Sequence, residues 1–518
     1  MKKLQATIAL MAMCLSGISQ VEYQYLEFNN VNALLSNGGV FFNDPDLSSP
    51  GYEVPKGSGN HGIYAMSFWF GGEDVNGQLK LAGTTYEQAG DFFPGALTAS
   101  GSAELPEEEE ATKQIYLISQ SQIDYHIANY DEVGYDMPDV IENWPAHGDL
   151  AYDLAFYLAP FQDVDGDGIY DPASGDYPLI KGDEAAYMIL NDKGGIHATG
   201  GDPIGLEIHL LFYQYATDDF INNTTFVNMR IINRGTQTLY DFRSACFVDG
   251  DLGSSTDDYV GFDEGADVMY CYNGDAYDAD YGENPPAIGV ALLNEDVAKF
   301  ASISDSPGAM GTPSTAAGYY NYMKGLWLDG TSFTYGGSGY GGAEAADYLY
   351  DGLPTTDLWS EVTAGNPAGE RKMMMSTQHY GGVFSPGMEL CYDYAVVYSH
   401  GEGHLENATN VVGLAEDAKA FYLADGEPYC NNVVLGLPEG KSDLEFSIYP
   451  NPTSGVFTIQ AQGEYSATIF TLDGRVVYQA NQLSGNSIIE TGFANGTYLV
   501  VLKDENDNYT NQLIVINK

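Results

Sequence analysis

One short segment of the chain carries carboxylates at regular spacing. In DVDGDGIYD, residues 163–171, the first, third, fifth and ninth positions are Asp and the sixth is Gly. Calcium takes about six to eight oxygen ligands, and alternate residues of a tight loop can turn their oxygens inward. Without a cation, carboxylates held this close would repel one another. The pattern predicts a calcium loop with these ligands: Asp163, Asp165, Asp167, Asp171 and the carbonyl oxygen of Ile169.

This loop is not expected to form an EF-hand. Its twelfth position is Ser174 instead of Glu, and the Pro and Gly residues that follow interrupt any helix. We therefore expect a helix-free calcium loop of the kind that occurs in extracellular proteins. A later acid would supply the remaining oxygen: Asp176, Asp183 or Glu184. The alternative is an acidic turn without a metal.

A second group of acids follows a predicted strand that ends near Val248. It lies in a segment rich in Gly and Ser and contains Asp249, Asp251, Asp257, Asp258 and Asp263. Clustered carboxylate oxygens at the end of a strand suit calcium. A solvated acidic loop explains the same residues equally well, so both interpretations stay open.

The sequence contains no familiar catalytic motif. HExxH, GxSxG and a phosphate-binding glycine loop followed by Lys are all absent. His400 and His404 flank Glu402, but the intervening glycines favour a loop at a strand end over a helical zinc pair. Paired carboxylates for glycoside hydrolysis cannot be picked out among 73 acidic residues, because sequence does not give their separations.

Composition excludes several classes of function. The 518 residues include 73 acids and 19 bases, which gives a net charge of −54. Such a charge repels nucleic acid and anionic lipid, so a nucleic-acid-binding role is not expected. Hydrophobic residues make up 44% of the chain and aromatic residues 13%, which is enough to form a core and argues against disorder.

Short strands dominate the predicted secondary structure. Residues 62–81 favour a hairpin that turns near Asn76-Gly77, apolar strand-like runs recur over 205–430, and residues 114–129 have helical spacing. We expect a mainly β protein with one or two antiparallel β-sandwich-like body domains, long loops and a small C-terminal Ig-like β-sandwich. The expected divisions are 1–19 (signal peptide), 20–204 (β-rich region with the calcium loop), 205–432 (β-sandwich), 433–445 (linker) and 446–518 (C-terminal module).

The N-terminus has the features of a secretory signal. Lys2 and Lys3 precede an apolar run to about Leu15, and small residues follow up to Ser19. The run is shorter than the ~20 residues of a spanning helix, and no later segment is apolar enough to span a bilayer. In an exported protein the remaining cysteines permit two disulfides or stay as buried thiols: Cys246, Cys271, Cys391 and Cys430.

The C-terminal segment, 446–518, has alternating apolar runs separated by turns, which predict a small antiparallel β-sandwich. It resembles the type A C-terminal sorting domain of Bacteroidetes type IX secretion. The matching residues are Tyr449-Pro450-Asn451-Pro452, Gly455, Leu472-Asp473-Gly474-Arg475, Gly496-Thr497-Tyr498 and Lys518. The resemblance implies export by the type IX secretion machinery and removal of the domain near 440–445. Attachment to surface lipopolysaccharide, or release, would follow.

The body of the chain, roughly 62–402, is similar to a recurring region of large secreted Bacteroidetes proteins. The similarity rests on phrases such as WFGGEDVNGQLKLAGTTY, NWPAHGDL and FVDGDLGSSTDDYVGFD. That family has no defined activity, so the resemblance implies an extracellular address and metal use and no reaction.

These features predict a secreted or cell-surface, calcium-binding, β-rich protein with a structural, adhesive or glycan-binding role. Its expected partners are the type IX machinery and either surface lipopolysaccharide or an extracellular glycan, and no membrane span is expected. The rival interpretation is an extracellular polymer-degrading hydrolase. That hydrolase would show a cleft with two converging carboxylates or a metal site that contains His.

Overall fold

The computed structural model describes residues 21–103, 111–305, 307–401, 403–424, 446–471, 476–504 and 509–518. Several predictions lie outside these residues: the signal peptide, the 433–445 linker, Glu402, Cys430 and the Leu472–Arg475 turn. The expected mainly β class is confirmed, because strands account for 40% of the structure and helices for 14%. None of the helices within the described ranges is long and apolar enough to cross a membrane.

The larger body sheet is antiparallel and has nine strands. In spatial order these are β10 (Phe93–Pro94), β14 (Glu184–Asn191), β15 (Leu206–Gln214), β16 (Thr225–Asn233), β25 (Glu389–Ser399), β22 (Ala287–Leu292), β19 (Val268–Asn273) and β18 (Asp258–Asp263), with β11 (Tyr116–Ser119) also paired to β14. Both faces of this sheet are covered. Along β15, Leu210 and Phe212 enter one core, whereas Leu211 and Tyr213 enter the other. Burial on both faces explains the near-continuous apolar runs of these strands.

The second body sheet has six strands and packs on one face of the first. Its members are β23 (Lys299–Ser304), β24 (Arg371–Thr377), β17 (Tyr240–Asp249), β8 (Ala65–Glu73) and β3 (Val40–Phe41), with β9 (Leu79–Gly83) paired to β8. The β8–β9 pair is the hairpin predicted over 62–81. Aromatic rings join the two sheets: the centroids of Phe68, on β8, and Tyr394, on β25, lie 5.3 Å apart.

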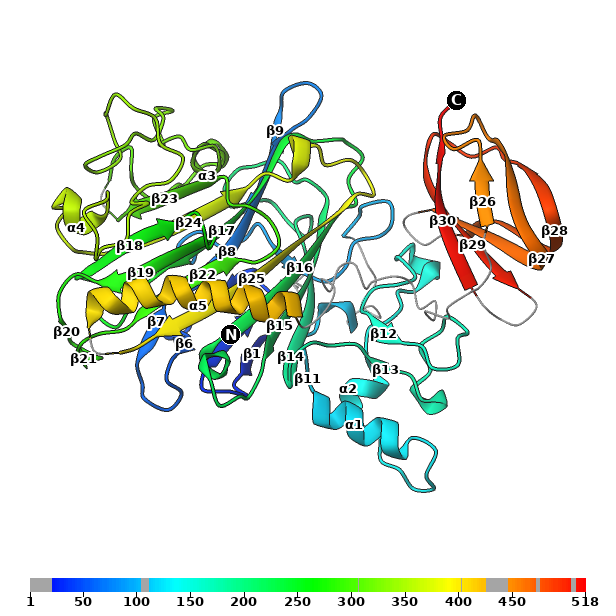
Figure 1. Ribbon diagram of the computed structural model, residues 1–518, viewed down its shortest axis with the longest axis horizontal. Coiled ribbons are helices and arrows are strands. Elements are labelled where there is room, and N and C mark those ends of the chain that lie inside the picture. Colours follow the sequence, from blue (N-terminus) through cyan, green and yellow to red (C-terminus); the bar gives the residue numbers. More distant parts are fainter. Residues whose placement is uncertain are drawn as a thin grey trace, which may run out of the picture.

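Helix α5 (His404–Ala424) covers the other face of the large sheet, where it lies across β25, β22 and β19 (Figure 1). Its buried positions recur at helical spacing and include Ala408, Val411, Ala415 and Ala418. Small side chains let the helix approach the sheet closely, and Gly289 of β22 leaves room beneath Val411. This helix was not among the elements expected from the sequence.

The remaining elements of the body are short. They are β1 (Tyr23–Leu26), β2 (Asn32–Ser36), β6 (Tyr52–Glu53) and β7 (His61–Ile63) in one sheet, the pairs β4 (Asn43–Asp44) with β5 (Ser49–Pro50), β12 (Phe161–Gln162) with β13 (Tyr177–Pro178) and β20 (Tyr277–Asp278) with β21 (Gly282–Glu283), and the helices α1 (Gln120–Asn129), α2 (Asp139–Glu142), α3 (Ala316–Met323) and α4 (Glu361–Ala364). Of the segment 114–129, which was expected to be helical, only the later part from Gln120 to Asn129 forms a helix. Ser119 forms a capping box with Gln122 and so starts α1 at Gln120.

The expected division of the body at 204/205 falls inside both sheets. β14 pairs with β15 across this position in the large sheet, and β8 pairs with β17 across it in the small one. Separating the two segments would expose the apolar faces of strands that the structure buries, so both belong to one sandwich. Among the described cysteines, Cys246 and Cys271 are free and buried, and Cys391 is disulfide-bonded.

The C-terminal module has a sheet and a core of its own. Its antiparallel strands are β26 (Phe446–Tyr449), β27 (Val456–Thr471), β28 (Val476–Glu490), β29 (Gly496–Asp504) and β30 (Tyr509–Ile516). Strand β27 lies in the middle and pairs with β26, β28 and β29. The core contains Phe457, Ile459, Ile469, Val500 and Ile514, and every buried residue of this cluster comes from the module.

Candidate metal sites

The acidic loop of residues 163–176, here called the 163–176 loop, is held at both ends by a strand pair. It starts directly after β12 and ends directly before β13, and these two strands pair with each other. Carboxylate oxygens of Asp163, Asp165 and Asp176 lie within 4.8 Å of one another. Two oxygens on opposite sides of Ca²⁺, each about 2.4 Å from it, span the same distance. The three carboxylates can therefore share one calcium ion.

Backbone N–H groups fix the two buried carboxylates of this loop. Asp163 accepts hydrogen bonds from the N–H groups of Gly166 and Gly168, both at 2.7 Å. Asp176 accepts from Val164 at 2.7 Å and from Asp171 at 2.8 Å. Each carboxylate oxygen has two lone pairs, so these bonds orient the groups and leave capacity for a cation.

The other acids predicted as ligands of the loop do not join this group. Asp167 accepts from the N–H of Ile169 at 2.7 Å, and Asp171 accepts from the N–H of Ala173 at 3.0 Å, so both cap local turns. Asp183 follows β13 in the sequence and accepts the N–H of Ala216 at 2.8 Å, and Glu184 begins β14. Of the three acids considered for the remaining oxygen, Asp176 is the one that converges.

Two histidines that sequence reasoning did not connect with the loop hold it in place. His147 Nε2 accepts the N–H of Tyr170 at 2.7 Å, while Nδ1 lies 3.0 Å from the carbonyl oxygen of Phe156. His126 Nε2 lies 2.9 Å from the carbonyl oxygen of Asp176. Burial lowers the pKa of both histidines and raises the pKa of Asp176. The neighbouring carboxylates raise the pKa of Asp176 further. A bound cation would oppose this effect on Asp176.

The second predicted cluster is only partly brought together. Carboxylate oxygens of Asp249 and Asp251 lie within 4.8 Å of each other and of Glu370, a residue that was not predicted. Asp258 begins β18 and Asp263 ends it, so about 16 Å of extended strand separates them. Asp263 instead caps the turn to β19 by accepting the N–H of Ala266 at 3.0 Å. Asp263 is therefore not a ligand of the same ion.

His400 and His404, for which the sequence favoured a loop over a zinc pair, belong to no group with metal-binding geometry among the described residues. His400 is exposed and lies beside the rings of Tyr281 and Tyr398, and His404 begins α5. Both groups of acids with metal-binding geometry in the described ranges consist of carboxylates alone.

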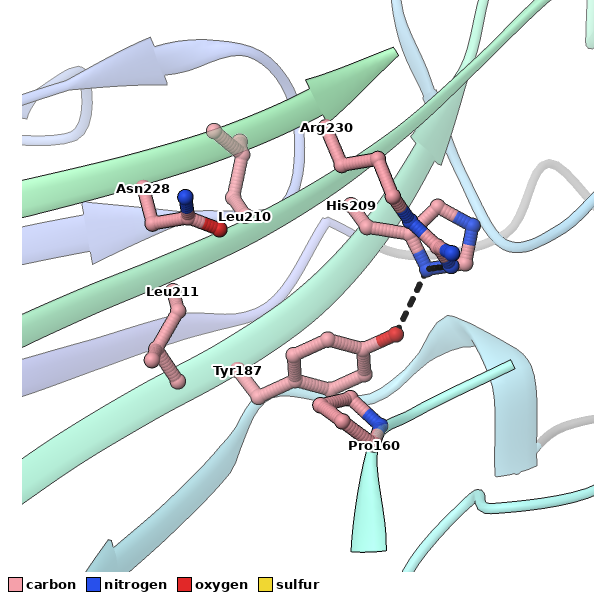
Figure 2. A pocket seen from close by; sticks show the side chains of 7 residues that line it. All are labelled: Pro160, Tyr187, His209, Leu210, Leu211, Asn228 and Arg230. Atoms are coloured by element: carbon pink, nitrogen blue, oxygen red, sulfur yellow. Dashed lines mark hydrogen bonds between the residues drawn. The ribbon is translucent and has the colours of Figure 1, made fainter. Parts of the chain in front are cut away.

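A small internal cavity contains a polar cluster around His209 (Figure 2). His209 Nδ1 faces the hydroxyl of Tyr187 at 2.6 Å and Nη2 of Arg230 at 3.4 Å. Its Nε2 lies 3.0 Å from Glu207, which also pairs with Arg234 at 2.9 Å. Tyr187, His209 and Arg230 are all buried, and their mutual hydrogen bonds offset the cost of removing these polar groups from water.

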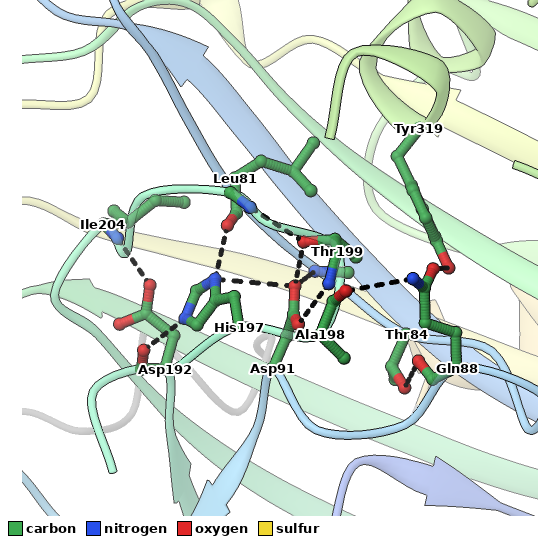
Figure 3. A network of polar contacts seen from close by, with 12 residues as sticks. Leu81, Thr84, Gln88, Asp91, Asp192, His197, Ala198, Thr199, Ile204 and Tyr319 are labelled. Atoms are coloured by element: carbon green, nitrogen blue, oxygen red, sulfur yellow. Dashed lines mark hydrogen bonds and ion pairs between the residues drawn. The ribbon is translucent and has the colours of Figure 1, made fainter. Parts of the chain in front are cut away.

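A second buried network surrounds His197 (Figure 3). Its Nδ1 lies 2.8 Å from the carbonyl oxygen of Leu81, and its Nε2 lies 2.6 Å from that of Asp192. The Asp91 carboxylate is 3.4 Å from Nδ1 and accepts the hydroxyl of Thr199 at 2.7 Å. This network joins β9 to the loop that follows β14, so it has a structural role.

Residues 447–516 match the family described as the secretion system C-terminal sorting domain. This match confirms the predicted type IX secretion sorting domain, and such a domain directs a protein to secretion or to the cell surface. A comparison with curated proteins found no match.

Two solved structures show distant likenesses. A polysaccharide lyase is 9% identical with a TM-score of 0.19, over 60% of this chain and 34% of the lyase. A BSP domain of a biofilm-associated protein is 8% identical with a TM-score of 0.13, over 96% of this chain and 80% of that one. The chain thus spans about a third of the lyase's length. Neither likeness carries an argument about fold or function.

Proposed function

We propose that this exported protein is an extracellular or cell-surface calcium-binding protein, and that calcium in the 163–176 loop stabilises its body. The observation that carries the proposal is the convergence of Asp163, Asp165 and Asp176 in a helix-free loop closed by the β12–β13 pair. Two of these carboxylates are buried, at 5% and 0% exposure. Burying a charge is costly unless it is paired, and a divalent cation supplies that pairing.

Calcium would stabilise the folded state because the unfolded chain does not hold these oxygens together. A ligand present at a hundred times its Kd contributes about 2.7 kcal/mol to the free energy of unfolding. The mature protein, stripped with chelator and then given millimolar calcium, is therefore expected to melt several degrees higher. Metal analysis of the untreated protein should find bound calcium.

Asp165→Asn tests whether the effect arises in this loop. Asp165 is exposed, so the substitution removes one ligand charge with little other change. Asp131→Asn is the matched control, since Asp131 is exposed and lies outside both acidic groups. We expect Asp165→Asn to bind one calcium fewer and to gain less from calcium than the control. Equal calcium content and equal melting shifts in the two variants would contradict the proposal.

We further propose a binding role at the cell surface, with a glycan as the partner. Support comes from exposed aromatic rings on the long segment between β23 and α4. Tyr335 is 47% exposed and lies 4.7 Å from Trp359, and Tyr340 is 44% exposed and lies 6.2 Å from Trp327, measured between ring centroids. Flat rings fixed against buried tryptophans suit stacking on sugar rings.

A glycan array probed with calcium present tests this role. Tyr335→Ala with Tyr340→Ala should lose the binding seen for the unaltered protein. Tyr240→Ala is the control, because Tyr240 is similarly exposed, at 46%, on a different element. Failure of the unaltered protein to bind any glycan or any bacterial surface would count against the role.

A further inference from the structure

Strand register places three carboxylates on one side of the β17–β24 pair. In this antiparallel pair Asp249 lies opposite Lys372. Continuing the register by two residues on each strand places Asp251 opposite Glu370, and residues two apart on a strand point to the same face. The structure accordingly holds oxygens of Asp249, Asp251 and Glu370 within 4.8 Å of one another. Asp251 and Glu370 thus contribute to one cluster although they lie 119 residues apart in the sequence.

The carboxylate at the centre of this cluster is buried and poorly paired. Asp249 is 0% exposed, and neither of its carboxylate oxygens has a hydrogen-bond partner of good geometry, although the hydroxyl of Tyr86 interacts with it. One oxygen of Asp251 is also buried without a partner. Buried acceptors are normally satisfied, and an unpaired buried carboxylate costs several kcal/mol. Unpartnered oxygens that point into a group of like charges indicate a missing cation.

Unpartnered acceptors continue into the adjoining loop and strand. Buried side-chain oxygens of Asp257, Asp258 and Asn273 also lack hydrogen-bond partners. The segment after Asp251 is tied to the segment before Glu370, because Gly369 donates its N–H to the carbonyl oxygen of Asp258 at 3.1 Å. The wall around the cluster therefore contains further buried oxygen atoms with unused acceptor capacity.

The nearby basic side chains compensate the charge of the cluster only in part. Lys372 is buried and its positive charge acts on Asp249 across the strand pair, but its ammonium forms ion pairs with Asp305 at 3.1 Å and Glu87 at 3.7 Å. Arg371 points to the other side of the strand and pairs with Glu361 at 2.9 Å. Both bases thus have other carboxylate partners among the described residues, and the three-carboxylate group keeps an excess of negative charge.

We propose that Asp249, Asp251 and Glu370 bind a divalent cation, and that this cation is Ca²⁺. All three ligands are hard carboxylate oxygens, with no nitrogen or sulfur donor in the group, which is the donor set that calcium prefers. The ion would join the end of β17 to the segment before β24. We call this the β17–β24 site, and it does not depend on occupancy of the 163–176 loop.

Calorimetric titration of the chelator-stripped mature protein with calcium chloride tests the inference. Asp165→Asn serves as the background, because it removes a ligand of the other proposed site. In that background Glu370→Gln should weaken the remaining calcium site by about tenfold or more. Glu344→Gln, an exposed residue with the same change of charge, should leave the site unchanged.

The outcomes separate the two proposed sites. If Asp165→Asn removes the only calcium bound and Glu370→Gln changes nothing, the β17–β24 site is overturned and the 163–176 loop stands. If Glu370→Gln abolishes the only calcium bound, the reverse holds. Preferential binding of zinc or magnesium at the site would overturn its assignment to calcium. Glu370 is only half-buried, so Glu370→Gln remains a usable test even if Asp249→Asn fails to fold.

Discussion

His209 and His197 are both buried, but their neighbours present opposite chemistry to the ring. Nδ1 of His209 faces the hydroxyl of Tyr187 and the guanidinium of Arg230, so this nitrogen must accept. Both nitrogens of His197 face carbonyl oxygens, which can only accept. The partners of both rings include residues that are distant in the sequence, so spacing along the chain does not give them.

His209 is expected to make the protein sensitive to acid. Burial and the adjacent Arg230 lower its pKa to about 4, from an ordinary value of 6.5. Between these values the unfolded chain binds the proton and the folded one does not, so stability falls as pH falls from 6.5 to 4. The full effect is about 3 kcal/mol. Measurement of the free energy of unfolding by denaturant, at pH 7 and pH 5, follows this loss.

His209→Gln should remove this part of the pH dependence, because glutamine does not titrate. His379→Gln is the control: His379 is half-exposed and pairs with Glu295 at 2.9 Å, away from the buried cluster. The prediction is wrong if His209→Gln keeps the same loss between pH 7 and pH 5 as the unaltered protein and the control.

At the scale of elements, local sequence patterns predicted where strands form better than they predicted which strands pair with each other. The strand-like runs expected over 205–430 include those that form β15, β16, β17, β24 and β25, because β-branched and aromatic residues between turn residues are typical of strands. Glu370 was missed as a site residue because it belongs to no acidic motif. Its place beside Asp251 follows from the register of β17 and β24, which sequence spacing does not contain.

Helix α5 is an element that the sequence pattern did not predict. Its alanines give a weak apolar pattern, and the glycines before it suggested a loop. Only the flat face of the large sheet, with Gly289 beneath Val411, makes small residues the right ones for this helix. Element boundaries in such cases depend on the surface that the element covers.

Ala415→Leu should destabilise the protein by about 1–3 kcal/mol, because the longer side chain has no space between α5 and the sheet. Ala415 is 0% exposed. Ala420→Leu provides the matched control on the same helix, since Ala420 is exposed. Urea unfolding of both variants measures the difference. Equal stability of the two would show that α5 is not packed as described.

At the scale of the whole molecule, the sequence overestimated how separable the body is. Residues 20–204 and 205–432 were expected as separate units because recurrent strand-like runs begin near residue 205, yet each contributes strands to both sheets. Pairings such as β8 with β17 join residues more than 160 positions apart, as Glu73 and Tyr240 show. The C-terminal module was identified correctly because its motifs and its core are both local to one stretch of chain.

Removal of residues 446–518 should block export without unfolding the body. The buried core of the C-terminal module contains only its own residues, and both body cores contain only residues before 425. In a bacterium with the type IX machinery, the truncated protein is expected inside the cell, and the purified body should melt within a few degrees of the full chain. The matched control is a reporter protein that carries the same N-terminal signal with or without residues 446–518, and only the former should reach the medium or the cell surface. Truncated protein found outside the cell, at the level of the full chain, would show that export does not depend on the sorting domain.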